Sequence, residues 1–180
     1  RILGAQAIGK GNADKRIDVI ATMITMNGTI EDLKELELTY SPMFSTAKDV
    51  VNMAALVATN ILENRFKQVH VDEVRGLVES NAYILDVREV GEFANGHIKN
   101  AVNIPLSELR ERMNEIPKDR TIYVHCRSAQ RSYNAVMALL HNGYENVYNV
   151  SGSFLGICLY EYYKDITKKR EPIVTQYNFK

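Results

Sequence analysis

The sequence has little cysteine: only Cys126 and Cys158 occur in 180 residues. Two cysteines are too few for a disulfide scaffold, and their spacing matches no zinc-binding pattern, so we predict neither disulfides nor a metal site. Free thiols are typical of a reducing compartment, and we therefore expect a cytoplasmic protein.

The sequence also lacks an excess of charge of either sign and any long apolar run. The 22 lysines and arginines balance 22 aspartates and glutamates. This balance does not favour binding to nucleic acid or to an anionic membrane. No apolar run is long enough to span a bilayer, and no signal peptide is visible. Because the chain begins at Arg1 without a methionine, we expect a fragment of a longer protein.

Apolar residues are abundant, at 46% of the chain, and can form a sizeable core. At this length the chain fits one domain or one and a half. From residue 68 onward, short apolar runs alternate with helical patterns, which indicates an α/β fold with a parallel sheet flanked by helices. Strands are predicted at residues 83–87, 101–104, 121–125 and 147–150, and helices at 71–79, 89–95, 106–113, 132–141 and 154–163.

Residues 1–65 have a different pattern, with a predicted strand at 1–8 and predicted helices at 14–26, 29–35 and 49–63. Thr29 followed by Asp32 is typical of a capping box. Residues 64–67 have no apolar period and are interpreted as a linker. The first segment has few strands and would bury little surface alone. We therefore predict an incomplete α+β segment at 1–65 and an α/β domain at 66–180.

The residues most typical of a reactive site follow the predicted strand 121–125. Cys126 ends that strand and begins a loop that leads into a helix. Backbone N–H groups of such a loop, and the positive end of the helix dipole, favour the thiolate, which is the nucleophile. We predict that Cys126 is catalytic and that the rest of the loop binds an anionic substrate, through Arg127, Ser128, Ala129, Gln130 and Arg131. The alternative is a buried structural cysteine.

Two other residues, His125 and Cys158, are not assigned to catalysis. His125 precedes Cys126, but adjacent strand residues point to opposite faces, so His125 is a poor candidate for a base. Cys158 lies among apolar residues, which favours a core thiol, with a resolving cysteine as the alternative.

Five motifs within residues 68–170 resemble the rhodanese domain. They occupy residues 86–89 with 92–93, 96–98, 101–106, 126–131 and 150–153. The resemblance implies a catalytic cysteine in a loop between a strand and a helix, and a sulfurtransferase that holds a sulfane sulfur on that cysteine as a persulfide. It also implies that Asp86 and Arg88 form a structural ion pair. Ala129 and Ser153 stand where the family commonly has glycine.

The loop length favours sulfur over phosphate. The spacing here is Cys-x4-Arg, whereas the related phosphatases have Cys-x5-Arg, in which the extra residue widens the loop. A phosphatase or arsenate-reductase-like enzyme is therefore the less favoured alternative, and a non-catalytic module that docks persulfide carriers is another. The expected sulfur donors and acceptors are CoA or glutathione persulfide, polysulfide and thiosulfate.

Residues 1–65 resemble the end of the dimerisation domain of flavin-dependent pyridine nucleotide-disulfide oxidoreductases, in the branch of CoA-disulfide and persulfide reductases. The resemblance rests on residues 1–6, 12–18, 38–45 and 48–54. It implies a homodimer with FAD and NAD(P)H domains upstream, and CoA as a ligand. This chain has no Gly-x-Gly-x-x-Gly motif, and we expect it to bind none of these cofactors alone. The same resemblance brings Tyr40 to the reductase site and Lys48 and Asn52 to CoA; the alternative for Tyr40 is a ring in the core.

Overall fold

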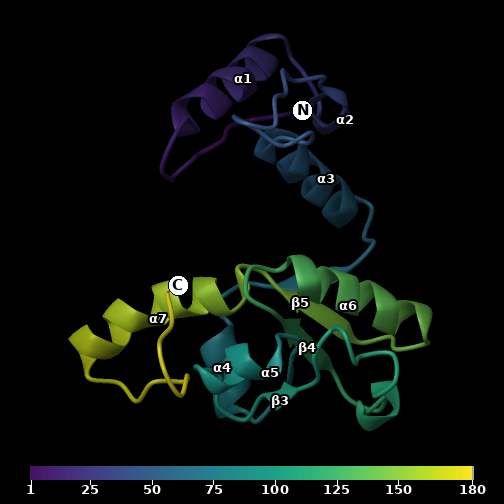
Figure 1. Ribbon diagram of the computed structural model, residues 1–180, viewed down its shortest axis with the longest axis vertical. Coiled ribbons are helices and arrows are strands. Elements are labelled where there is room, and N and C mark those ends of the chain that lie inside the picture. Colours follow the sequence, from purple (N-terminus) through teal and green to yellow (C-terminus); the bar gives the residue numbers. More distant parts are fainter. Residues whose placement is uncertain (180) are drawn as a thin grey trace. The chain divides into compact units, whose positions relative to one another are not determined.

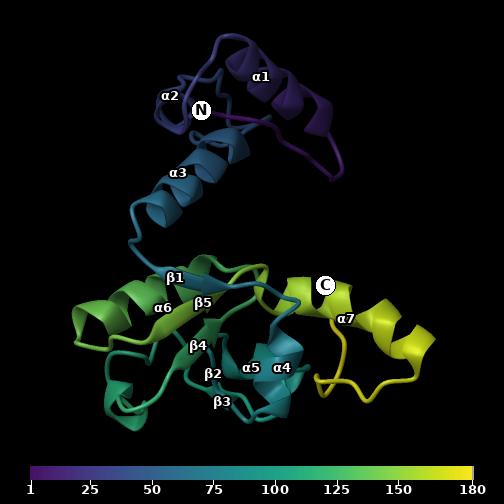
Figure 2. The same cartoon turned by 180° about the vertical axis from the view of Figure 1, so that it is seen from behind.

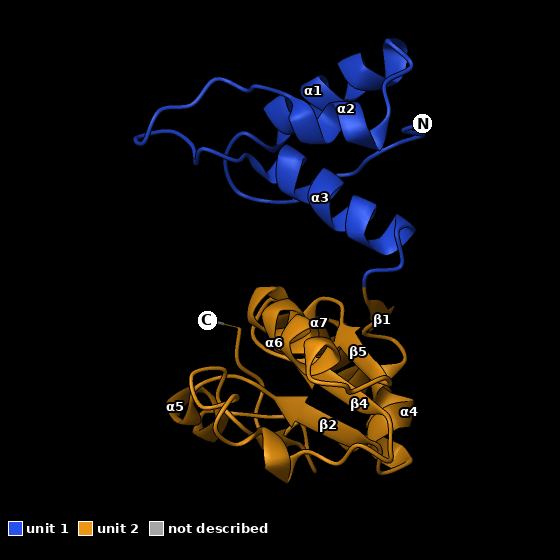
Figure 3. Ribbon diagram, turned by 90° about the vertical axis from the view of Figure 1, so that its right-hand side faces the viewer, with its two compact units in different colours: residues 1–65 blue, residues 66–180 orange. Residues whose placement is uncertain are grey.

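The computed structural model describes residues 1–179 and divides the chain into two compact units, Arg1–Arg65 and Phe66–Lys180. Figure 3 shows the first unit in blue and the second in orange. The first unit has one buried apolar cluster and the second has two, so each unit is described by itself.

The first unit consists of three helices, α1 (Ala13–Thr25), α2 (Ile30–Glu35) and α3 (Val50–Leu62). The capping box at the start of α2 is confirmed: the Thr29 N–H donates to Asp32 Oδ2 at 2.8 Å, and the Asp32 N–H donates to Thr29 Oγ1 at 3.2 Å. The predicted strand at residues 1–8 is wrong. That segment makes one backbone hydrogen bond, from the Ile2 N–H to the Gly28 carbonyl, and a strand requires a full ladder with a partner.

Helix α3 leaves an apolar face exposed within the first unit. Its buried side chains include Val51 and Ala55, whereas the apolar side chains of Val50, Met53, Val57 and Ile61 are exposed.

The second unit is built on one sheet, with strands β1 (Lys67–Val69), β2 (Tyr83–Asp86), β3 (Val102–Asn103), β4 (Ile122–His125) and β5 (Val147–Val150). Their order is β1-β5-β4-β2-β3, and every neighbouring pair is parallel. The helices are α4 (Val74–Glu79), α5 (Val90–Ala94), α6 (Gln130–His141) and α7 (Ser153–Lys168), as Figures 1 and 2 show. The predicted parallel sheet flanked by helices is confirmed.

Two apolar clusters cover the two faces of this sheet. On one face Leu85 and Val124 pack with Leu139 of α6. On the other face Ile84 packs with side chains of α4 and α7, including Val74 and Phe154. This alternation along β2 is the two-residue period of a strand buried on both sides.

Several predicted boundaries differ from the structure, among them the start of α4 at Val74 rather than at residue 71. The supposed linker at 64–67 includes the start of β1, which pairs with β5. Residues 106–113 form turns that lead into a short 3-10 helix, Met113–Glu115, rather than an α-helix. Helix α7 continues to Lys168, beyond the predicted end at residue 163.

Candidate functional site

Cys126 lies directly after β4, at the carboxyl edge of the sheet. Helix α6 begins at Gln130, two residues earlier than predicted, and Ala129 precedes it in the left-handed conformation with φ of 77°. The start of α7 fixes the loop from the other side, because the N–H groups of Phe154 and Leu155 donate to the carbonyls of Cys126 and Arg127 at 3.1 Å each. The carboxyl edge of a parallel sheet is where α/β proteins bind ligands.

The surroundings of Cys126 stabilise a thiolate. Its side chain is buried, with 1% of the residue exposed. Burial alone raises the pKa of this thiol, but hydrogen bonds from the Ser132 N–H and hydroxyl, and from the N–H groups of Ser128 and Ala129, outweigh it, so that the pKa lies below its ordinary value. A buried sulfur with a lowered pKa, within a ring of backbone donors, is typical of a reactive cysteine.

Two buried serines lie behind this sulfur. The Ser153 hydroxyl accepts the Cys126 N–H at 3.2 Å and lies 4.0 Å from the Cys126 Sγ. The Ser132 hydroxyl lies 2.7 Å from Asn149 Oδ1. Sequence reasoning did not identify either serine as a contact of the sulfur. The one signal was that Ser153 replaces a common glycine, and its φ of 47° is indeed in the left-handed region.

Both predicted arginines lie in the loop region, but their hydrogen-bond partners differ. The Arg131 guanidinium donates two hydrogen bonds to Glu92 of α5, at 2.7 and 2.8 Å. This pairing raises the pKa of Arg131, and it lowers the pKa of the Glu92 carboxyl. Among residues 1–179, Arg127 makes one longer contact, from Nη1 to the Asn178 carbonyl at 3.4 Å. The role of Glu92 as the partner of Arg131 was not predicted.

The predicted ion pair of Asp86 and Arg88 is present and fully buried. Arg88 Nη2 lies 2.6 Å from Asp86 Oδ2, and it also donates to the Gly96 carbonyl at 2.8 Å. The guanidinium stacks over the Phe154 ring, 4.0 Å from its centroid. These contacts connect the end of β2 to the start of α7, so the pair supports the loop without touching the sulfur.

His125 is buried beside this pair, and burial lowers its pKa. Its Nδ1 lies 3.2 Å from the Cys126 carbonyl oxygen, and its Nε2 lies 3.5 Å from Asp86 Oδ2. The imidazole therefore faces the backbone of Cys126. Among residues 1–179 no group of three or more His, Cys, Asp or Glu side chains is arranged to hold a metal ion.

Comparison with known protein families identifies the family to which the domain with this loop belongs. The family model described as "Rhodanese-like domain" matches residues 70–159, which is half of the chain and includes the whole cysteine loop. The chain belongs to the rhodanese-like domain family. The chain is also 40% identical over 72 residues to a sulfurtransferase of Allochromatium vinosum, a match that covers 40% of this chain and 67% of that protein.

Two solved structures resemble more of the chain than this family match. The reduced Bacillus anthracis CoADR-RHD is 47% identical with a TM-score of 0.75, over 78% of this chain and 25% of that one. A NAD-dependent persulfide reductase from A. fulgidus is 38% identical with a TM-score of 0.72, over 81% of this chain and 26% of that one. Because the second unit is less than two thirds of the chain, both similarities extend into the first unit. The chain spans about a quarter of each of these proteins.

The other predicted residues lie outside the cysteine loop. Tyr40 is 51% exposed, which contradicts a ring in the core, and Lys48 is exposed as well. Asn52 is buried, and its amide donates to the carbonyls of Leu33 and Leu36 at 3.2 and 3.0 Å, so it serves the fold of the first unit. Cys158 is fully buried as predicted for a core thiol, and burial raises its pKa.

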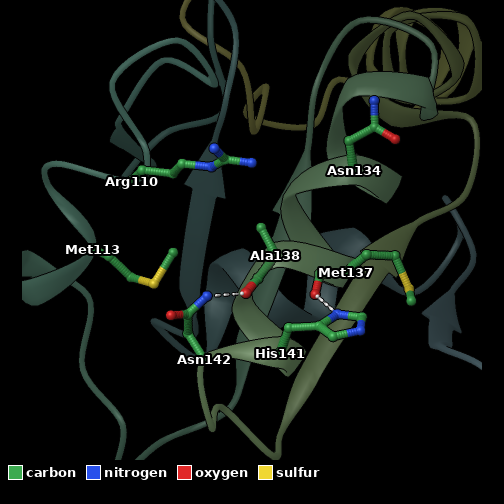
Figure 4. A pocket seen from close by; sticks show the side chains of 7 residues that line it. All are labelled: Arg110, Met113, Asn134, Met137, Ala138, His141 and Asn142. Carbon is green, nitrogen blue, oxygen red and sulfur yellow. Dashed lines mark hydrogen bonds between the residues drawn. The ribbon is translucent and has the colours of Figure 1, made fainter.

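A cavity of about 540 Å³ lies beside α6, away from the cysteine loop. Figure 4 shows its lining, with the His141 imidazole bound to the Met137 carbonyl and the Asn142 amide bound to the Ala138 carbonyl. The lining residues are Arg110, Met113, Asn134, Met137, Ala138, His141 and Asn142. None of them belongs to residues 126–131, so this cavity is separate from the rhodanese site. No helix among residues 1–179 is long and apolar enough to cross a membrane.

The left-handed conformation of Ala129 leads to a stability prediction. Changing Ala129 to glycine is expected to raise the free energy of unfolding by about 0.5–1 kcal/mol, because glycine adopts a positive φ without a Cβ clash. The matched control is Ala138→Gly inside α6, which is expected to lower that free energy by about 0.5–1 kcal/mol. Urea denaturation measures both. Equal losses in the two variants would contradict the assigned conformation of Ala129.

Proposed function

We propose that the rhodanese domain transfers sulfane sulfur through a persulfide on Cys126, and that in the whole protein it serves a reductase that uses FAD and NAD(P)H. The observation that carries the first part is the position of Cys126, buried at the carboxyl edge of the sheet with its sulfur in a ring of backbone and hydroxyl donors. Such donors are directed at the place where negative charge resides during sulfur transfer.

The transfer is a nucleophilic displacement between sulfur atoms. The Cys126 thiolate attacks the outer sulfur of a persulfide R–S–SH, and a new S–S bond forms on Cys126 while the S–S bond of the donor breaks. The donor leaves as the thiolate R–S⁻, and the enzyme carries Cys126–S–SH. No net oxidation occurs, since one thiolate and one persulfide are consumed and one of each is formed.

Phosphate transfer is less favoured by the same geometry. A phosphate needs a wider loop and an arginine free to bind two of its oxygens. The second arginine of this loop, Arg131, is held by two hydrogen bonds to Glu92. A catalytically idle docking module is disfavoured because the lowered pKa of Cys126 has no use in simple docking.

The proposal for the whole protein rests on the first unit. Similarity to the CoADR-RHD and to the persulfide reductase continues into residues 1–65. We therefore propose that upstream domains hold FAD and NAD(P)H, that the full-length protein is a homodimer, and that its donors and acceptors include CoA or glutathione persulfide, polysulfide and thiosulfate. Tyr40 and Lys48, both exposed, are the residues of this chain proposed to contribute to the reductase site.

Mass spectrometry of the intact chain tests the sulfur transfer. After incubation with thiosulfate or CoA persulfide, the chain is expected to gain one sulfur atom, and peptide mapping is expected to place it on Cys126. Cys126→Ser should gain none, whereas Cys158→Ser, the matched control, should gain sulfur as the parent chain does. A chain that takes up no sulfur from either donor but cleaves phosphate esters would contradict the proposal.

A further inference from the structure

The chain continues beyond the family match and returns to the cysteine loop. The match ends at residue 159, and α7 ends at Lys168. In Figure 1 the yellow chain leaves the end of α7 and runs back toward the beginning of that helix. We call residues 171–179 the C-terminal strap.

The first half of the strap is firmly attached to the rhodanese domain. The Thr175 N–H donates to the His97 carbonyl at 2.8 Å, and Ile173 and Val174 are buried in the apolar cluster under α7. A Cβ added to Gly96 would lie 2.5 Å from the Gln176 carbonyl oxygen, so only glycine lets the strap pass here. These contacts hold the strap as far as Gln176.

The second half, residues 177–179, is held by ring contacts and by hydrogen bonds, one of them from the Asn178 amide to the Asn95 carbonyl at 3.5 Å. The Tyr177 hydroxyl donates to Asp165, and the rings of Tyr177 and Phe179 each meet Tyr162 edge to face at 5.2 Å. Phe179 is itself partly exposed. We call residues 177–179 the strap tip.

Asn178 in the strap tip contacts both the cysteine loop and the second cysteine. Its carbonyl oxygen lies 3.4 Å from Arg127 Nη1. Its backbone N–H donates to the Cys158 sulfur, which offsets part of the rise that burial causes in the Cys158 pKa. One peptide segment therefore covers Cys158 and occupies the arginine next to Cys126.

The two arginines of the loop differ in how easily an anion can replace their present hydrogen-bond partners. Arg131 donates twice to a carboxylate at 2.7 and 2.8 Å, which is a charge-assisted bidentate pair. Within the part of the chain that the structure describes, Arg127 donates once, to a neutral carbonyl at 3.4 Å, which is beyond the usual range for a strong hydrogen bond. An anionic group that enters the site would form stronger bonds to Arg127 than Asn178 does.

We propose that the strap tip is a specificity element of the rhodanese site. Asn178 holds Arg127 in position through its carbonyl oxygen. An anionic sulfur donor binds by forming hydrogen bonds to Arg127 in place of that carbonyl, and it thereby displaces the tip. The proposal rests on the proposed function, because the displacing anion is the sulfur donor. Donor binding and opening of the tip are then coupled, so each favours the other to the same extent. A donor without an anionic group near its sulfur gains nothing from Arg127 and leaves the tip closed.

Alkylation of Cys158 reports whether the tip is open. In a Cys126→Ser background, which removes the reactive thiol, iodoacetamide labelling of Cys158 is followed by peptide mass spectrometry. Changing Tyr177 and Phe179 together to alanine should speed this labelling about tenfold, because the tip loses its aromatic contacts. The matched control is Tyr163→Ala, which removes another ring beside Tyr162 outside the strap, from a residue that is 72% exposed. This control should label like the parent chain.

Coupling to the donor is tested in the same background with thiosulfate. Thiosulfate should speed the labelling of Cys158 about threefold or more over sodium chloride at equal ionic strength, with iodoacetamide in large excess because thiosulfate itself consumes this reagent, and the acceleration should disappear in Arg127→Gln. Labelling that is unaffected by thiosulfate, or by loss of the two tip rings, would overturn the proposal.

Failure of this proposal is distinguishable from failure of the proposed function. Sulfur uptake by the chain with Cys126 intact measures the function alone. If Cys126 takes up sulfur while Cys158 labelling ignores both thiosulfate and the tip variant, the strap proposal is wrong and sulfur transfer stands. If the tip variant exposes Cys158 but Cys126 takes up no sulfur, then both the proposed sulfur transfer and the coupling of the tip to a sulfur donor are contradicted. Only the opening of the tip is then supported.

Discussion

Replacing Arg88 by methionine is expected to lower the free energy of unfolding of the rhodanese domain by about 3–5 kcal/mol. Methionine has a similar reach, but it leaves the Asp86 carboxylate buried without its cation and the Gly96 carbonyl without its donor. With 1% of Arg88 exposed, water cannot replace these bonds. Urea denaturation followed by circular dichroism measures the loss.

Two further variants distinguish the effect of an unpaired buried charge on stability from the effect of losing any arginine. Arg112→Met removes an arginine whose pairs with Glu108 and Glu115 are exposed, and it should leave the unfolding midpoint nearly unchanged. Combining Arg88→Met with Asp86→Leu should recover part of the lost stability, since no unpaired charge is then buried. A loss below about 1 kcal/mol in Arg88→Met would show that the buried pair contributes little.

Replacing Glu92 by glutamine is expected to make Cys126 react about threefold to tenfold faster at pH values below the Cys126 pKa, where a further lowering of that pKa increases the thiolate fraction. Glutamine keeps the hydrogen bond that the Glu89 N–H donates to this side chain, but it removes the charge that neutralises Arg131. The unneutralised guanidinium favours the thiolate and lowers the Cys126 pKa further. The difference in reaction rate should vanish at pH values above the Cys126 pKa of both the parent chain and the variant, because the thiol is then fully ionised in each.

The pH profile of Cys126 alkylation by iodoacetamide checks this sign. Arg131→Gln should shift the profile the other way, to higher pH. Glu79→Gln is the matched control: it makes the same change of charge at the end of α4, which runs back from the carboxyl edge of the sheet, and it should leave the profile unchanged. A shift to higher pH in Glu92→Gln would contradict the electrostatic role assigned to Arg131.

The position of Cys126 could be predicted because the signals for it are local. An apolar run, a short polar loop and a helical pattern follow one another between residues 121 and 141, and each is specified by neighbours in the sequence. The capping box of α2 was predictable for the same reason, since Thr29 and Asp32 are three residues apart. The ion pair of Asp86 and Arg88 also lies within three residues, at the end of one strand.

The errors concern segments whose structure depends on distant partners. Residues 1–8 have a strand-like composition but no partner strand, and strand formation requires cross-strand hydrogen bonds. Strand β1 was missed because it has three residues and too little pattern, and its pairing with β5 joins residues about eighty positions apart. The start of α6 at Gln130 depends on the left-handed turn at Ala129, a conformation that alanine seldom adopts.

The sequence by itself determined the fold class, the two-part division of the chain and the position of the candidate nucleophile, because periodicity, turn chemistry and a strand–loop–helix pattern act over a few residues. Only the tertiary structure decided what the two arginines of the loop do. Glu92 lies 39 positions from Arg131, and Asn178 lies 51 positions from Arg127. The sequence marks neither pairing, because the sheet and the returning strap bring these groups together.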